Sequence, residues 1–303
     1  MLNKIIAHIL PYMPKKLVWI FSQRYIAGET IEDGLRVARE LNEQGINVTI
    51  DLLGEFITNL SQAKENKQKY IEIIERFTNE NIRGNFSLKP TMFGLLIDRD
   101  VCYAHLREIT AKAVEKNNFI RIDMEDSKCV DPELTLFKSL KAEFSGHVGL
   151  VLQAYLHRTI KDLVYFSQLP TNGHPLNFRL CKGIYIEPAE IAYKGHELVR
   201  DHYLEDLEFM LKNKMFAAIA THDKILVEGA LKLLEKYQVP KSMYEFQMLY
   251  GVTPELRNSI VTEGHKMRVY VPFGHEWFNY STRRLKENPQ VAGHIIKALF
   301  FRG

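Results

Sequence analysis

The hydrophobic and polar positions of the chain form one pattern that occurs eight times. A short apolar run is followed each time by a longer segment in which apolar and polar residues alternate with helical spacing. Short apolar runs of this kind indicate buried strands, and the longer segments indicate helices that cover them. The runs lie at Val48–Leu52, Phe86–Leu88, Phe119–Ile122, Val148–Leu152, Phe178–Cys181, Phe216–Ala220, Met243–Phe246 and Met267–Val271.

Helix start and stop signals support the segments between these runs. Residues 1 to about 45 are predicted to be helical, with Thr30 as the N-cap of a helix that runs toward Gln44 and ends at Gly45. The triplets Asp131-Pro132-Glu133 and Thr253-Pro254-Glu255 each supply a cap, a proline at the first helical position and an acid in the first turn.

Strands that alternate with long helical connections predict a parallel sheet. Eight such units favour an α/β fold of the closed (βα)8 TIM-barrel type, and an open doubly wound sheet is the alternative. No glycine-rich GxGxxG follows the first run, which weakens a Rossmann interpretation. Since no linker or low-complexity segment interrupts the pattern, we expect residues 1–303 to form a single barrel domain, with 1–45 as an N-terminal helical extension.

A short helix near the end of the chain carries an unusual polar face. Tyr280, Arg283, Arg284 and Glu287 are spaced at i, i+3, i+4 and i+7, so they share one side of a helix that Asn288-Pro289 ends. A helix that faces a core normally has apolar residues at these positions. The face is therefore either solvated or closes over a polar pocket, and we expect this final helix to lie over the barrel mouth.

Composition and charge narrow the class of protein. The 303 residues are 46% hydrophobic and 25% charged, as in ordinary globular proteins. The net charge of +3, from 40 basic and 37 acidic residues without a basic run, does not suggest a nucleic-acid partner. The three cysteines are widely spaced and form no metal or disulfide motif, which favours a reducing compartment. The first residues, broken by two prolines and Lys15-Lys16, form neither a convincing signal peptide nor a membrane span.

Polar side chains follow or end each apolar run. Because chemistry in barrels of this type gathers at the carboxyl ends of the strands, these residues are expected to converge on one rim and to bind a large polar ligand. They are Asp51, Lys89, Asp123, Gln153, Arg179 with Lys182, Thr221 with His222, Gln247 and Tyr270.

Several of these positions allow two interpretations. Asp123 lies in a cluster with Glu125 and Asp126, which suits a metal ion or a structural ion pair, but no histidine has ligand spacing and we predict no metal site. Arg179 and Lys182 would bind an anion or an electron-rich ligand, or would pair with carboxylates of the barrel itself.

The polar residues at the remaining strand ends also allow two interpretations each. Gln153 would contact a planar heterocycle or bridge the backbone. Thr221-His222, at the start of a helical segment, would favour a phosphate, or Thr221 would simply cap the helix. No Ser-His-Asp arrangement and no catalytic cysteine motif can be recognised.

Six segments together resemble the flavin-dependent proline dehydrogenases, in order over roughly residues 45 to 290. The length is similar to that of the small monofunctional bacterial members, since no aldehyde dehydrogenase domain follows. The segments are IRIDMEDS (120–127), LQAYLHRT (152–159), FRLCKGIY (178–185), ATHD (220–223), YEFQMLYGV (244–252) and RVYVPFGHEWFNYSTRRLKENP (268–289).

The resemblance implies a distorted (βα)8 barrel that holds FAD at the carboxyl ends of its strands. The implied reaction is oxidation of L-proline to 1-pyrroline-5-carboxylate, the first step of proline catabolism, with electrons passed to a membrane quinone. It also implies a cytoplasmic protein, with a weak peripheral contact at the inner face of the cell membrane.

The resemblance also implies roles for individual residues. Asp123 and Arg179 match catalytic positions. The positions that bind the substrate carboxylate are matched by Lys89, Arg283 and Arg284. Those around the substrate ring are matched by Leu249, Tyr270 and Tyr280. The flavin-contacting positions match Met124, Gln153, Arg179, Lys182, Gly183, Ile184, Thr221 and His222.

Two positions depart from the family pattern. Ile184-Tyr185-Ile186 stands where many members have Ala-Tyr-Trp, which bears on the stacking around FAD. Asp223 replaces a common asparagine after Thr221-His222, which bears on the contacts near the adenosine. Two other functions remain as alternatives. A folate-reducing barrel flavoenzyme would require NAD(P)H as its electron donor, and a non-catalytic barrel would be expected to lose Arg179 or the Arg283-Arg284 pair.

Overall fold

A computed structural model of the chain describes residues 15–278 and 280–282. Eight strands form a closed barrel in the order β1 to β8, and every neighbouring pair is parallel. The predicted (βα)8 barrel is therefore confirmed, and the open-sheet alternative is wrong. Each predicted apolar run overlaps one strand. The strands are β1 Asn47–Leu52, β2 Gly84–Leu88, β3 Ile120–Ile122, β4 Val148–Gln153, β5 Asn177–Cys181, β6 Phe216–Ala220, β7 Tyr244–Leu249 and β8 Met267–Phe273.

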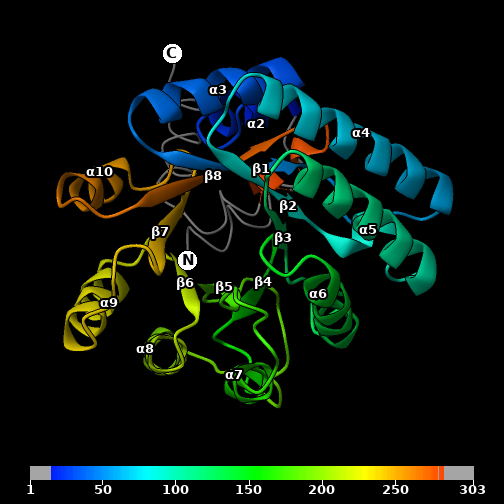
Figure 1. Cartoon of the computed structure of the whole chain (residues 1–303). Helices are drawn as coiled ribbons and strands as arrows, with labels where there is room; N and C mark the ends of the chain where they lie inside the picture. The colour runs from blue at the N-terminus through cyan, green and yellow to red at the C-terminus, as the bar shows by residue number, and fades with distance from the viewer. Residues whose placement is uncertain (1–14, 279, 283–303) are drawn as a thin grey trace.

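Helices surround the strands, which Figure 1 shows gathered at the centre of the molecule. The longest described helix, α4, connects β1 to β2, and a short 3-10 turn, η2, follows β2 directly. The helical elements are α2 Lys15–Ser22, α3 Ile31–Glu43, α4 Leu60–Asn79, η2 Pro90–Phe93, α5 Arg99–Glu115, α6 Val130–Glu143, α7 Thr159–Ser167, α8 His196–Lys212, α9 Lys224–Lys236 and α10 Pro254–Thr262.

The predicted helix starts are correct at α3 and α10 and wrong at α6. Thr30 caps α3 through a reciprocal capping box with Asp33, and α10 begins at Pro254. α6 begins at Val130, so Asp131 is not its cap and Pro132 is the third helical residue. Proline is tolerated there because the first N–H groups of a helix have no intrahelical partner.

Helix α3 precedes the barrel in sequence but packs against both β1 and β8. Gly34 makes this close approach possible. A Cβ atom at Gly34 would lie 3.2 Å from the ring of Phe273 and 3.3 Å from the ring of Phe77. The N-terminal helix therefore covers the join between the first and last strands.

Alternation along the strands separates an apolar outer face from a polar interior. Phe178 in β5 faces outward, where its ring centroid lies 5.6 Å from that of Phe137 in α6 and 5.4 Å from that of Phe166 in α7. Its neighbour Arg179 must therefore face the barrel interior. Polar side chains also meet across the interior lower down, where Thr49 Oγ1 donates to Asn85 Oδ1 at 2.6 Å.

The described part of the predicted final helix begins at Trp277, and residues 277, 278 and 280–282 are helical. The Trp277 ring lies 4.7 Å from that of Trp19 in α2, and Tyr280 belongs to the same buried apolar cluster as Val18 and Leu53. The predicted residues Arg283, Arg284 and Glu287 lie outside the described residues. None of the described helices has the length and apolar character needed to cross a membrane.

Candidate active site

Asp123 is the centre of a hydrogen-bonded group at the carboxyl ends of the strands. Its Oδ1 accepts from Ser87 Oγ and from Arg179 Nη1, each at 2.8 Å, and its Oδ2 accepts from the Tyr270 hydroxyl at 2.8 Å. These donors come from β2, β5 and β8, so side chains from distant parts of the sequence converge on one carboxylate. Asp123 is only 9% exposed, and the donors satisfy its charge.

A second set of bonds fixes the orientation of Arg179. Its Nε donates to Gln247 Oε1 at 2.7 Å, and Gln247 Nε2 donates to Glu245 Oε1 at 2.7 Å. Glu245 in turn pairs with Arg268 at 2.6 Å. The Arg179 guanidinium carbon lies 5.2 Å from the centre of the Tyr270 ring, within the range of a cation–π contact. The guanidinium is thus held on several sides before any ligand binds.

Lys89, directly after β2, extends this group toward β1. Its ammonium forms an ion pair with Asp51 and lies 3.4 Å from the Tyr270 hydroxyl. Burial raises the pKa of Asp51 to about 6, against the opposing effect of Lys89. Burial acts to lower the pKa of Lys89, but the charges of Asp51 and Asp123 outweigh it and the pKa lies above its usual value. Lys89 therefore remains a cation at neutral pH.

The other predicted substrate residues that the structure describes lie close to this group. Leu249, the last residue of β7, is in register with Tyr270 in β8. Tyr280 and Lys89 line the same cavity of about 690 Å³, between the loop after β1 and the loop after β8. The structure thus brings the predicted substrate residues Lys89, Leu249, Tyr270 and Tyr280 to one side of the barrel mouth.

Met124 and Gln153 lie beside Asp123, on the β3–β4 side. Both side chains are buried, and Gln153 Nε2 donates to the backbone carbonyl of Glu125 at 2.9 Å. The amide thus forms the backbone bridge that was one of the two interpretations of Gln153. The bond orients the amide at the barrel mouth.

The loop after β5 places Lys182, Gly183 and Ile184 at the opposite side of the mouth. Gly183 has φ +109, and a Cβ atom there would lie 2.1 Å from the ring of Tyr155, so only glycine fits. Ile184 is half exposed and Ile186 is fully exposed, which leaves apolar surface on this loop.

Asp223 organises the cations on this side. Its Oδ2 accepts from Lys182 Nζ at 2.6 Å and from Arg200 Nε at 2.7 Å. Its Oδ1 accepts from Ile225 N–H at 3.1 Å and so caps α9. One carboxylate therefore serves two cations, and Arg200 also pairs with the exposed Glu197 at 2.7 Å, so the charges of this group balance.

Thr221 and His222 lie between these two groups. The predicted cap at Thr221 is wrong, because α9 begins at Lys224 and its N-cap is Asp223. Thr221 Oγ1 instead accepts from the Asp223 N–H at 3.1 Å. His222 Nε2 accepts from Leu249 N–H at 2.8 Å, which connects the end of β6 to the end of β7.

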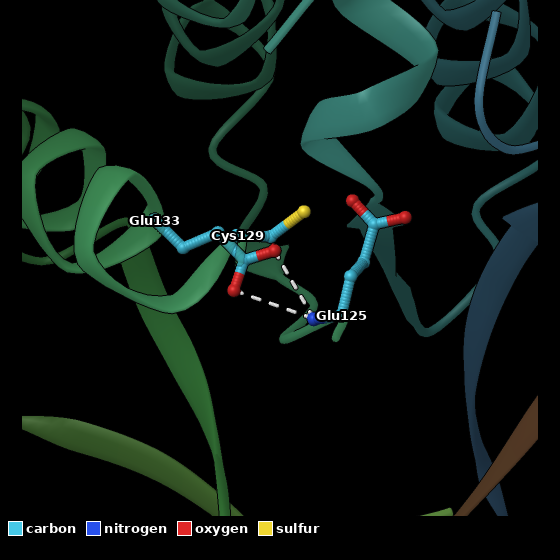
Figure 2. Close-up of side chains that lie close together, drawn as sticks. All are labelled: Glu125, Cys129 and Glu133. Atoms are coloured by element: carbon cyan, nitrogen blue, oxygen red, sulfur yellow. Dashed lines mark hydrogen bonds between the residues drawn. The ribbon is translucent and has the colours of Figure 1, made fainter. Parts of the chain in front are cut away.

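A separate buried cluster lies under the loop after β3. Glu125, Cys129 and Glu133 have ligand atoms that all lie within 4.8 Å of one another (Figure 2). Both carboxylates already accept hydrogen bonds, since Thr91 donates to Glu125 and the Glu125 N–H donates to Glu133. These bonds account for the arrangement without an ion.

Sequence reasoning missed Ser87, and it placed Asp51 and Gln247 among the strand ends that converge on the rim without giving either a role in the site. Ser87 interrupts the apolar run Phe86–Leu88 at the position that alternation directs inward, and this signal could have identified it. The pairing of Asp51 with Lys89 and of Gln247 with Arg179 is long-range. It follows from the register of the closed barrel and not from local sequence.

The geometry favours binding and orientation over nucleophilic attack. The mouth holds fixed cations, one carboxylate with three donors, and amide and hydroxyl groups. Burial raises the pKa of Cys181, at the end of β5, to about 11, so its thiol is not an activated nucleophile. A closed parallel barrel with its charged groups at the carboxyl ends of the strands is the architecture of a TIM-barrel enzyme.

Comparison with known proteins identifies which barrel enzyme family this is. The family model described as proline dehydrogenase matches residues 34–296. Proline dehydrogenase 1 of Bacillus subtilis is 34% identical over 278 residues, covering 92% of this chain and 90% of the relative. The proline dehydrogenase of Deinococcus radiodurans is 34% identical over 291 residues, covering 95% of this chain and 92% of the relative. The chain therefore belongs to the proline dehydrogenase family, and it is an oxidoreductase of proline catabolism.

Solved structures agree on the fold. Proline utilization A from Bdellovibrio bacteriovorus, inactivated by N-propargylglycine, superposes with a TM-score of 0.83 at 25% identity, over 88% of this chain. The chain spans 32% of the length of that protein. Proline utilization A from Bradyrhizobium japonicum, at 21% identity and a TM-score of 0.75 over 90% of this chain and 32% of that protein, shows the same fold.

Proposed function

We propose that this enzyme binds FAD at the carboxyl ends of its strands and oxidises L-proline to 1-pyrroline-5-carboxylate, with a membrane quinone as the final electron acceptor. The observation that carries the proposal is the group in which Arg179, Tyr270 and Ser87 all donate to Asp123. It provides a rigid, charged surface at the barrel mouth, where substrate and cofactor would meet.

The residues present fit a flavin dinucleotide. Arg179 and Lys182 are cations, and Lys182 donates to Asp223, which it shares with Arg200, so the loop after β5 offers a cationic side chain to a diphosphate. Gln153 supplies a fixed amide next to the predicted ring site, and Ile184 and Ile186 expose apolar surface that a planar base would cover. When bound, the flavin supplies the acceptor for the hydride that leaves C5 of proline.

The side chains of this chain would bind and orient the substrate. Lys89, which keeps its proton at neutral pH, would bind the proline carboxylate, and we assign Arg283 and Arg284 to the same carboxylate on the resemblance alone. Tyr270 and Leu249 would flank the proline ring. Asp123 would hold Arg179 and Tyr270 in place, and Arg179 would stabilise negative charge that develops on the cofactor side.

The spectrum of the purified protein tests this proposal. The protein should be yellow, and its flavin bands should bleach anaerobically when L-proline is added. NADH in place of proline should not bleach them, which separates this activity from a folate-reducing flavoenzyme. A colourless protein that cannot be reconstituted with FAD would overturn the proposal.

We extend the proposal to the cellular setting, on the family resemblance. The protein would be cytoplasmic, with a weak peripheral contact at the inner face of the cell membrane, where quinones are found. Proline-dependent reduction of a quinone in lipid vesicles, compared with the same quinone in detergent, tests both the acceptor and the contact. Equal rates in both would argue against the membrane contact.

A further inference from the structure

Glu125, in the loop after β3, accepts two hydrogen bonds from Thr91 in the turn that follows the neighbouring strand β2. It lies two residues after Asp123 and is 1% exposed. Its Oε2 accepts from the backbone N–H of Thr91 at 2.9 Å, and its Oε1 accepts from the Thr91 hydroxyl at 2.6 Å. Thr91 itself lies two residues after Lys89, in η2. The Glu125 side chain therefore connects the loop after β3, which begins at Asp123, to the turn after β2, which begins at Lys89.

The backbone of Glu125 is held as firmly as its side chain. Its N–H donates to both carboxylate oxygens of Glu133 in α6, at 3.1 and 3.3 Å, and its carbonyl accepts from Gln153 in β4. Figure 2 shows both Glu133 oxygens facing this nitrogen. The loop after β3 is thus held by hydrogen bonds to α6 and β4. The Glu125 side chain, which holds Thr91, is therefore itself fixed in position.

Thr91 extends the connection to a third loop. Its hydroxyl oxygen accepts from the backbone N–H of Phe56 at 3.0 Å while its hydrogen goes to Glu125. Phe56 has φ +52, a conformation that a bulky residue adopts only when its surroundings hold it there. The loops after β1, β2 and β3 therefore meet at the contact between Thr91 and Glu125.

We propose that Glu125 is a positioning residue for proline oxidation, which fixes the separation of Lys89 and Asp123 by its two-point contact with Thr91. It touches neither substrate nor cofactor. The inference rests on the proposed function, because its consequence is a correctly spaced pair of substrate-binding and catalytic groups.

The contact does not require a charged Glu125. Burial raises the pKa of Glu125 to about 7, against the hydrogen bonds from Thr91. A protonated carboxyl can still accept the Thr91 N–H and donate to its hydroxyl oxygen, which has lone pairs for both Glu125 and Phe56. A glutamine at this position can do the same. The proposal requires both hydrogen bonds between residue 125 and Thr91, and it does not require a charge on residue 125.

Two substitutions at Glu125 separate positioning from charge. Glu125→Ala removes both contacts to Thr91, and Glu125→Gln keeps both. We expect kcat/KM for L-proline, per folded enzyme, to fall at least tenfold in Glu125→Ala, and to stay within about threefold of wild type in Glu125→Gln. Thr91→Val, which keeps the backbone contact and loses the hydroxyl, should lie between them, and Thr91→Ser should match wild type.

A matched control measures the effect of losing any buried carboxyl. Asp206 in α8 is 3% exposed and lies in a helix that carries none of the three loops. Asp206→Ala should leave KM and kcat per folded enzyme unchanged whatever its effect on stability, with the folded enzyme measured by active-site content and the stability by urea unfolding. If Glu125→Ala behaves in the same way, Glu125 has a structural role only and the proposal is wrong. Equal impairment in Glu125→Gln and Glu125→Ala would also overturn it.

A binding measurement distinguishes failure of this inference from failure of the proposed function. Tetrahydro-2-furoate has the ring and carboxylate of proline with an ether oxygen in place of the nitrogen, so it can bind without being oxidised. Its dissociation constant, measured by calorimetry, should rise at least fivefold in Glu125→Ala and remain unchanged in Glu125→Gln. If wild type neither binds it nor oxidises proline, the proposed function fails. If wild type does both and Glu125→Ala does so equally well, only the positioning role fails.

Discussion

Replacing Tyr270 by phenylalanine would remove one hydroxyl from the centre of the site, which donates to Asp123 and accepts a longer contact of 3.4 Å from the Lys89 ammonium. The substitution keeps the ring, and with it the contact to the Arg179 guanidinium at 5.2 Å. It deletes only the hydroxyl that donates to Asp123 Oδ2 at 2.8 Å. The bonds from Ser87 and Arg179 to Oδ1 remain, so Asp123 should keep its place but lose the group that fixes its second oxygen.

The size of the effect follows from the charge and burial of the acceptor. A hydrogen bond to a charged group contributes about 1.5–3 kcal/mol, and an ionised acceptor left without its partner in a buried site costs a similar amount. Asp123 is nearly buried and Tyr270 is only partly buried, so we expect the lower half of this range. The free energy of unfolding should fall by about 2 kcal/mol. If the same bond persists in the transition state, kcat/KM should fall roughly 10- to 30-fold.

A double-mutant cycle with Asp123→Asn provides the assay. Urea unfolding and steady-state oxidation of L-proline would be measured for wild type, both single variants and the double variant. Ser87→Ala, which removes a bond to the other oxygen of the same carboxylate, serves as the matched control. The coupling energy between Tyr270 and Asp123 should be at least about 1 kcal/mol. Additive effects, with a coupling below about 0.3 kcal/mol, would refute the hydrogen bond as the cause.

Three further outcomes are expected. Tyr270→Ser should reduce the preference for proline over 4-hydroxyproline, because it opens space and offers a hydroxyl partner; an unchanged ratio of the two kcat/KM values would exclude Tyr270 from the pocket. Asp223→Asn should bind FAD several-fold more tightly, with a steeper salt dependence in a fluorescence titration, because Lys182 loses its internal counter-charge while Arg200 keeps Glu197. Burial raises the pKa of Asp206 to about 8, so its folded form retains a proton that the unfolded form loses above about pH 4, and wild-type stability should fall as pH rises through that window. Asp206→Asn lacks this term, and its urea stability relative to wild type should increase by about 1.4 kcal/mol per unit between pH 5 and 7.

The barrel could be predicted from sequence because its signals are local and repeated. Each strand is a short apolar run, and local start signals mark some of the helices, as at Thr30 before α3 and Pro254 in α10. The start of α6 was missed because Asp131-Pro132-Glu133 has the composition of a cap, yet proline fits equally well at the third helical position. Glu133 is buried beneath the loop after β3, and local composition does not reveal this burial.

The site was predictable as a set of strand ends but not as a network. Parallel topology brings Asp123, Arg179 and Tyr270 to the same rim, and this follows from their positions in, or directly after, three of the runs. Which donor reaches which acceptor depends on register and on side-chain direction. The contact of Lys182 with Asp223, for example, spans 41 residues of sequence and joins two separate units. The local pattern predicts which residues lie at the strand ends, and closure of the barrel determines which of them bond to one another.

The charges inside the barrel are almost balanced. Among the described residues, the interior network contains Lys89, Arg121, Arg179 and Arg268 as cations and Asp51, Asp123 and Glu245 as acids, while Lys182, which also directly follows a strand, pairs with Asp223. Four cations against three carboxylates leave one positive charge in a largely buried space. Each carboxylate has its own cation, and the fourth, Arg121, is held by the backbone carbonyls of Leu150 and Asn177. Asn177 is the first residue of β5, so Arg121 lies toward the amino ends of the strands and away from the mouth. A ligand that binds only the folded barrel stabilises it by mass action, so the unfolding temperature should rise when a carboxylate or a diphosphate that binds at the mouth is added.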